Sequence, residues 1–215
     1  MLETTSADSL SRAFAGRGLA CRRGERLVFG GLSFTLPRGG TLLLTGPNGS
    51  GKSSLLRLMA GLSRPEAGSL FWDGIPLEED PAAHRARLHF IGHEDAVKPA
   101  LAVGETLGFW AGMHGSATVA AALAHFRLES LADWPCRHLS AGQRRRLALA
   151  RLLASPAPLW LLDEPTTGLE TEAQRDLLAA IAAHRCDGGR VAISTHAELP
   201  IADATVLVLP VFGPR

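Results

Sequence analysis

The segment at residues 46–53 constrains this chain more than any other. It reads Gly-Pro-Asn-Gly-Ser-Gly-Lys-Ser and lies between an apolar run and a helical pattern. The run at 41–45 predicts a buried strand, and residues 51–60 predict a helix that ends at Gly61. Glycines have no Cβ, so several backbone N–H groups can converge on one anion at the start of that helix. Strand, loop and helix together therefore predict a phosphate-binding loop in an α/β fold.

The side chains of this loop predict a bound nucleotide rather than a lone anion. Lys52 supplies a positive charge for the β- and γ-phosphates, and Ser53 supplies a hydroxyl for Mg²⁺. Lys52 is one of two lysines in a chain with twenty arginines, which strengthens this assignment. The alternative is an ordinary glycine-rich turn. The predicted nucleotide-binding residues are Gly46, Pro47, Asn48, Gly49, Ser50, Gly51, Lys52, Ser53 and Ser54.

Composition limits the classes of partner. The chain has 215 residues, which suits one domain or a core with an inserted subdomain. The net charge is +1 and the basic residues are scattered, so no electrostatic footprint for nucleic acid is present. Three distant cysteines without CxxC spacing favour neither a disulfide framework nor a zinc site. No apolar run reaches the roughly 18 residues that a bilayer requires, so another chain would have to do the spanning.

The order of apolar runs and helical patterns predicts a mostly parallel sheet core with an N-terminal antiparallel β subdomain and an inserted helical subdomain. We expect a single domain over residues 1–215, with its core at about 16–92 and 155–215 and its helical part at about 93–154. Residues 1–15 are predicted to be a loose end. Strands are expected within 19–36 and at 69–72, 88–91, 159–162, 190–195 and 204–209. Helices are expected at 103–113, 117–126, 141–153 and 171–184, with a short one near Glu198.

Two acids follow the apolar run at 159–162. Asp163 and Glu164 would lie at the carboxyl edge of a buried strand, where ligands of open α/β sheets bind. Asp163 is then placed to hold Mg²⁺, and Glu164 to accept a proton from the water that attacks the γ-phosphate. The alternative for either acid is a solvated strand end.

A third motif, Leu139-Ser140-Ala141-Gly142-Gln143, precedes a predicted helix and resembles the signature of the ATP-binding-cassette (ABC) family. The resemblance implies a P-loop NTPase fold of the ABC type that hydrolyses ATP with Mg²⁺. It also implies that Ser140, Gly142 and Gln143 face the nucleotide of a second copy, so that two ATP molecules lie between two chains. The alternative is a Ser-capped helix whose solvated face carries residues 144–146.

The family resemblance implies roles for three further residues. His196 matches the switch histidine that contacts the γ-phosphate and helps orient the attacking water. Glu94 stands where the family usually has a glutamine that reaches Mg²⁺, so it is a candidate metal ligand; the alternative is that it points to solvent and a water replaces it. The family's aromatic platform for adenine is missing near residues 22–24. Arg23 could stack there by its guanidinium plane, or simply face solvent.

Several segments are similar to the ATP-binding subunits of the bacterial cytochrome c maturation system, known as haem exporter ATPases. These are residues 61–68, 90–94, 104–110 and 139–145. The similarity implies a homodimer, peripheral on the cytoplasmic face of the inner membrane, that docks on integral membrane subunits and meets haem only indirectly. Two other readings stay open: the ATPase of another small importer or exporter, and a soluble cassette ATPase that acts on a macromolecule.

Overall fold

The computed structural model describes residues 12–113 and 118–210. Its N-terminal part is an antiparallel sheet in which β1 (Ala13–Arg23) pairs with β2 (Arg26–Pro37) and β4 (Ala67–Trp72), and β4 pairs with β5 (Ile75–Pro76). The predicted antiparallel pair within residues 19–36 is confirmed. The expectation of a loose end through residue 15 is wrong for residues 13–15, because this short apolar stretch is buried in β1. Residues 1–11 lie outside the described part.

The central element is a parallel sheet of five strands in the order β6-β7-β8-β3-β9. Its three inner strands are short apolar runs with almost every residue buried, as expected for strands that are covered on both faces. All neighbours in this sheet run parallel, so the carboxyl ends of the strands meet at one edge. The strands are β3 (Thr41–Thr45), β6 (Leu88–Ile91), β7 (Leu159–Asp163), β8 (Arg190–Ser194) and β9 (Thr205–Val208).

Helices cover both faces of this sheet. Except for the short helix expected near Glu198, the predicted helices are found at nearly the expected positions. No helix of the described residues is long and apolar enough to cross a membrane. The α-helices are α1 (Lys52–Met59), α2 (Pro81–Ala86), α3 (Val103–Met113), α4 (Val119–His125), α5 (Ala141–Ala154) and α6 (Thr171–Cys186). Two 3₁₀ helices, Glu129–Leu131 and Cys136–His138, lie between α4 and α5.

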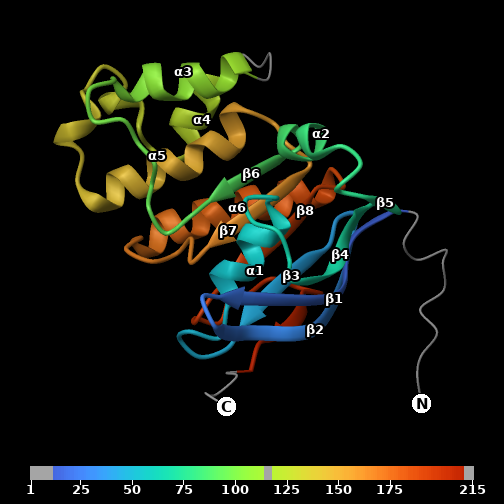
Figure 1. The fold of residues 1–215 in the computed structure, drawn as a ribbon. Coiled ribbons are helices and arrows are strands. Elements are labelled where there is room, and N and C mark those ends of the chain that lie inside the picture. Colours follow the sequence, from blue (N-terminus) through green and yellow to red (C-terminus); the bar gives the residue numbers. More distant parts are fainter. Residues whose placement is uncertain (1–11, 114–117, 211–215) are drawn as a thin grey trace.

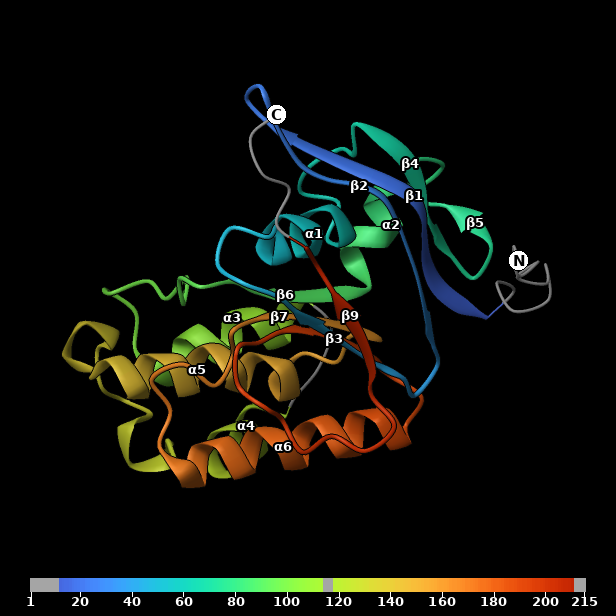
Figure 2. The same cartoon turned by 90° about the horizontal axis from the view of Figure 1, so that it is seen from below.

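The parallel sheet separates two apolar cores. On one face, Leu42 and Leu44 of β3 pack with α1 and the antiparallel sheet; on the other, Leu43 packs with residues of α3 to α6. This alternation follows from the period of two along a strand. Figures 1 and 2 show the resulting layers, with α1 between the two sheets and with α4, α5 and α6 on the far side of the parallel sheet. The predicted α/β class is confirmed.

One connection holds structure that the sequence patterns did not indicate. No helix or strand was expected between β4 and β6, but this segment forms β5 and α2. The helix begins with Asp80, whose carboxylate accepts a hydrogen bond from the N–H of Ala83 at 2.9 Å, and Pro81 occupies its first turn. Asp followed by Pro is a recognised start signal, but six residues are too few to show a helical period.

The short helix expected near Glu198 is absent from the structure, which has an irregular turn there. The Thr195 hydroxyl donates to the carbonyl of Ala197 at 2.8 Å and accepts from the N–H of Ala197 at 3.0 Å. These bonds satisfy the backbone locally, so a helix is not needed for that purpose. Pro200 has no N–H and restricts the residue before it, which excludes a helix of useful length.

Candidate active site

The phosphate loop joins β3 to α1 at the carboxyl edge of the parallel sheet. Gly46, Gly49 and Gly51 have φ angles of 137°, 79° and 101°, which side chains rarely allow. A Cβ on Gly46 would lie 2.4 Å from the Leu209 carbonyl oxygen, and one on Gly51 would lie 2.5 Å from a methyl group of Val28. Gly46 and Gly51 therefore need glycine both for backbone conformation and for space, and Gly49 needs it for backbone conformation alone.

Lys52 lies within this loop with 6% of its surface exposed. Its ammonium group donates to the carbonyl oxygens of Gly46 and Pro47, at 2.8 and 3.3 Å. Nearby, the buried Ser50 hydroxyl has no hydrogen-bond partner among the described residues. A loop that holds a buried cation and a free hydroxyl around a glycine backbone fits a phosphate ligand.

Asp163, at the end of β7, collects hydroxyl groups from two other elements. Its Oδ1 accepts from Ser53 of α1 at 3.1 Å and from Ser194 of β8 at 2.5 Å. Both bonds hold the carboxylate toward the phosphate loop. The hard oxygen atoms of Ser53 and Asp163 form a donor set of the kind that suits Mg²⁺.

Glu164 is held in an unusual backbone conformation, with a φ of +47°. Its N–H donates to both the carbonyl oxygen and the hydroxyl of Ser194, at 3.1 and 3.0 Å. Its carboxylate lies 3.2 Å from His196 Nε2 and accepts from the Thr167 hydroxyl at 3.4 Å. Strained residues of this kind persist where the surroundings hold them, and they concentrate at functional sites.

His196 connects the acid to the phosphate loop, since its Nε2 also lies 3.1 Å from Lys52 Nζ. One ring nitrogen can accept from Lys52 or donate to Glu164, but it cannot do both in the same tautomer. One of the two contacts is therefore unmatched. An anionic oxygen between Lys52 and His196 would accept from both side chains and remove the mismatch, which again fits a phosphate group.

Part of the predicted loop lines one open groove of about 380 Å³ together with Glu164, whereas Gly46, Pro47 and Ser50 do not line it. Arg23 of β1 and Arg26 of β2, from the antiparallel sheet, also line this groove. Arg23 is thus in reach of a ligand in the groove, as the stacking reading requires. The groove is lined by Arg23, Arg26, Val28, Asn48, Gly49, Gly51, Lys52, Ser53, Ser54 and Glu164.

Four predicted residues do not meet the phosphate loop within this chain. Ser140, Gly142 and Gln143 lie at the start of α5 and line a separate small hollow of about 80 Å³ beside Gly168. Ser140 accepts from the N–H of Gln143 at 3.2 Å, and the Gln143 side chain accepts from the N–H of Ser140 at 2.8 Å, which is a capping box. Glu94 follows β6, is exposed, and does not line the groove.

Comparison with known proteins identifies the family. A family model described as "ABC transporter" matches residues 29–167, which is more than half of the chain. The chain belongs to the ABC transporter family. The Cytochrome c biogenesis ATP-binding export protein CcmA of Rhodospirillum rubrum is 56% identical over 203 residues, covering 94% of this chain and 87% of that protein. The protein of the same name in Escherichia coli K12 is 43% identical, covering 88% and 92%.

Solved structures agree on the fold. The structure titled "Structure of ATP binding subunit of ABC transporter" has a TM-score of 0.82 at 24% identity and covers 93% of this chain and 88% of that one. The sequence matches, rather than this likeness in fold, make the chain an ABC ATP-binding protein of the CcmA type. The predicted resemblance to this family, and with it the prediction of an ATP-hydrolysing transport protein, is confirmed.

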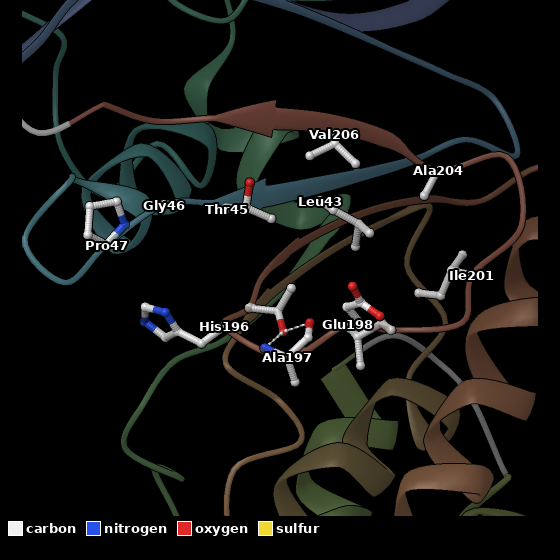
Figure 3. A pocket seen from close by; sticks show the side chains of 12 residues that line it. Leu43, Thr45, Gly46, Pro47, His196, Ala197, Glu198, Ile201, Ala204 and Val206 are labelled. Carbon is white, nitrogen blue, oxygen red and sulfur yellow. Dashed lines mark hydrogen bonds between the residues drawn. The ribbon is translucent and has the colours of Figure 1, made fainter.

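A second hollow lies beside the phosphate loop of this ABC protein, with a volume of about 660 Å³. Figure 3 shows Gly46, Pro47 and His196 at one end of it, and Leu43, Ile201 and Val206 at the other. The turn after β8 forms one wall, where a helix near Glu198 was expected.

Two residues of this ABC site were not predicted from the sequence. Ser194 is fully buried at the end of β8 and bonds to both acids. Arg145 donates to the backbone carbonyls of Asp163 and Glu164. A serine that ends an otherwise apolar strand was a usable signal for Ser194. Arg145 is the middle member of the run at 144–146, and nothing in that run distinguishes a buried arginine from a solvated one.

Proposed function

We propose that this chain is the ATP-hydrolysing subunit of a membrane export complex for cytochrome c biogenesis, and that its ATP hydrolysis powers the handling of haem. The strongest support is the 56% identity over nearly the whole chain to a protein named for that process. The alternative, an ATPase of another small transporter, shares the same chemistry and differs in cargo.

The proposed hydrolysis uses groups that already lie close together. The loop N–H groups and Lys52 hold the β- and γ-phosphates, while Ser53 and Asp163 hold Mg²⁺, which neutralises phosphate charge when bound. Glu164 takes the proton of the attacking water, since it is the carboxylate nearest to His196. His196 donates to the γ-phosphate and orients that water.

The site proposed here is completed by a second copy of the chain. Ser140, Gly142 and Gln143 lie outside the groove of their own chain, so they are available to the nucleotide of a partner copy. Integral membrane subunits would supply the spanning segments. This protein would then be peripheral on the cytoplasmic face of the inner membrane, with haem contacted by other subunits and no nucleic acid involved.

The variant Glu164→Gln tests the chemistry. The amide keeps the shape of the side chain but cannot take a proton, so turnover should fall by about 100-fold or more while MgATP affinity stays within about twofold. ATP hydrolysis and nucleotide calorimetry measure the two quantities. Glu79→Gln, an exposed acid before α2, is the matched control and should behave as wild type. Turnover of Glu164→Gln within twofold of wild type would remove Glu164 from the role.

A deletion strain tests the cargo separately. We expect loss of covalent haem attachment to cytochrome c, no rescue by Glu164→Gln, and co-purification of the tagged chain with membrane subunits. Normal cytochrome c in the deletion strain, with ATPase activity intact in the purified chain, would support the other transporter reading instead.

A further inference from the structure

We propose that Arg145 is a positioning residue for Glu164, and that it makes the rate of hydrolysis depend on where the loop after β6 lies. This inference rests on the proposed ATPase function. The loop concerned is residues 92–95, which carries Glu94. Arg145 does not line the groove of the phosphate loop. It acts through the backbone of residues 163–165, which we call the acid-bearing loop.

Arg145 contacts the acid-bearing loop through three carbonyl groups. It lies in the second turn of α5, just after the capping box, with 5% of its surface exposed. Its Nη2 donates to the carbonyl oxygens of Asp163 and Glu164, both at 2.9 Å. Its Nε lies 3.3 Å from the carbonyl oxygen of Pro165. One planar guanidinium group therefore fixes the three consecutive carbonyl groups around Glu164, and with them the direction of its side chain.

The other side of the same guanidinium holds the loop after β6. Nη1 donates to the carbonyl oxygen of Gly92 at 2.8 Å and to Asp95 Oδ1 at 3.1 Å. The Asp95 carboxylate is also the partner that balances the buried charge of Arg145. Arg145 therefore joins three segments that are distant in sequence: the signature helix, the acid-bearing loop and residues 92–95.

The strained backbone of Glu164 makes the position of this residue depend on Arg145. A left-handed backbone at a residue with a side chain persists where neighbouring groups hold it, and here Ser194 holds the N–H while Arg145 holds the carbonyl oxygen. If residues 92–95 move, Arg145 loses two of its partners and its buried charge is no longer balanced. The guanidinium must then shift, and the peptide units that orient Glu164 shift with it.

The first test is Arg145→Lys, which keeps the charge but not the fork of N–H groups. In the chain assembled with its membrane subunits, kcat should fall about tenfold or more, because the acid is misplaced. KM for ATP, and nucleotide affinity of the purified chain, should stay within about twofold. Arg151→Lys is the control: Arg151 is 8% exposed on the same helix, but it bonds to the carbonyl of Phe90 and stacks on Trp110.

The second test is Asp95→Ala; the Asp95 side chain is 21% exposed, and a melting curve checks that the variant is folded. It should lower kcat severalfold alone and add almost nothing to Arg145→Lys, because both act through one link. Wild-type kcat in folded Arg145→Lys, an equal loss in Arg151→Lys, or independent effects of the two substitutions would overturn the proposal. If wild type hydrolyses ATP and Glu164→Gln does not, such a result removes only the role of Arg145. If wild type does not hydrolyse ATP, the proposed function falls as well.

Discussion

Asp163 and Glu164 are neighbours in sequence, yet their carboxylates are placed for different tasks. Asp163 Oδ1 accepts two hydroxyl hydrogen bonds, from Ser53 and Ser194, and so is fixed on the loop side. Glu164 has one long hydroxyl contact, from Thr167, and otherwise faces His196. A fixed acid suits a metal ligand, and a loosely held one suits proton transfer, because the latter must exchange partners during the reaction.

The Glu94 carboxylate leads to a prediction about the Mg²⁺ requirement of hydrolysis. A carboxylate is a harder and fully charged ligand compared with the usual glutamine amide, so Glu94→Gln should raise the Mg²⁺ concentration for half-maximal hydrolysis by about twofold or more. ATP affinity at low Mg²⁺ should be equal or better, since the acid no longer repels the γ-phosphate. Glu94 is exposed here, so the effect requires the loop to close over the nucleotide. Superimposable Mg²⁺ titrations of the two proteins would exclude a metal role.

Site residues could be predicted from the sequence where they belong to one short motif, but not where they meet only through the fold. The loop at 46–53 and the acids at 163–164 are local patterns, and the structure brings them together: Glu164 lines the groove beside the loop, and Asp163 accepts a hydrogen bond from Ser53. Arg145 binds groups that are distant along the chain, so no spacing rule could indicate it, whereas Ser194 had a signal in its place at the end of an apolar run. The reading of residues 144–146 as a solvated face is wrong for Arg145, because tertiary contacts rather than helical period decide its burial.

The start of α5 has two roles: the Ser140–Gln143 capping box begins the helix, and the same residues are proposed to face the second nucleotide.

The element order was predictable because long helices and buried strands carry clear periods. Short elements were not predictable, because a single capping residue or a single proline determines whether a helix forms. Examples are α2, which forms after the Asp80 cap, and the turn after β8, which contains Pro200.

Two substitutions separate the role of Ser140 as a helix cap from its proposed role at the second nucleotide. Ser140→Ala removes the cap and should cost about 1 kcal/mol of stability, while the ATP-dependent dimer still forms. Ser140→Arg removes the cap and adds bulk and charge, so it should also block the closed dimer but leave ATP binding to the monomer intact. Light scattering with ATP, in the Glu164→Gln background, measures dimers. ATP-dependent dimers of Ser140→Arg would contradict a composite site.

A partly buried histidine near the amino-terminal end of β7 affects the stability of the protein in acid. His184 of α6 stacks on Trp160 of β7, with ring centroids 3.8 Å apart, and burial lowers the pKa of His184 to about 4. The unfolded chain takes up this proton below about pH 6.5, whereas the folded chain does not until about pH 4. Stability should therefore fall as the pH drops through this window.

The variant His184→Phe keeps a stacked ring and removes the titration. Its melting temperature should fall less than that of wild type between pH 6.5 and 4, by about 2 °C or more after allowance for solvent screening. Burial also lowers the pKa of His84, so part of the acid loss should remain. His93→Gln, at an exposed position, is the control. Parallel curves for wild type and His184→Phe would show that His184 is solvated in the folded chain.

The close approach of Gly46 to the Leu209 carbonyl has a practical meaning for anyone who builds fusions of this protein. The N–H of Leu209 bonds to Thr45, so the backbone just past β9 forms the rear wall of the phosphate loop. A tag or reporter joined at or before Leu209 would replace that wall and disturb the glycine backbone that binds phosphate. An attachment point after Pro210 keeps Leu209 and its hydrogen bond to Thr45 in place.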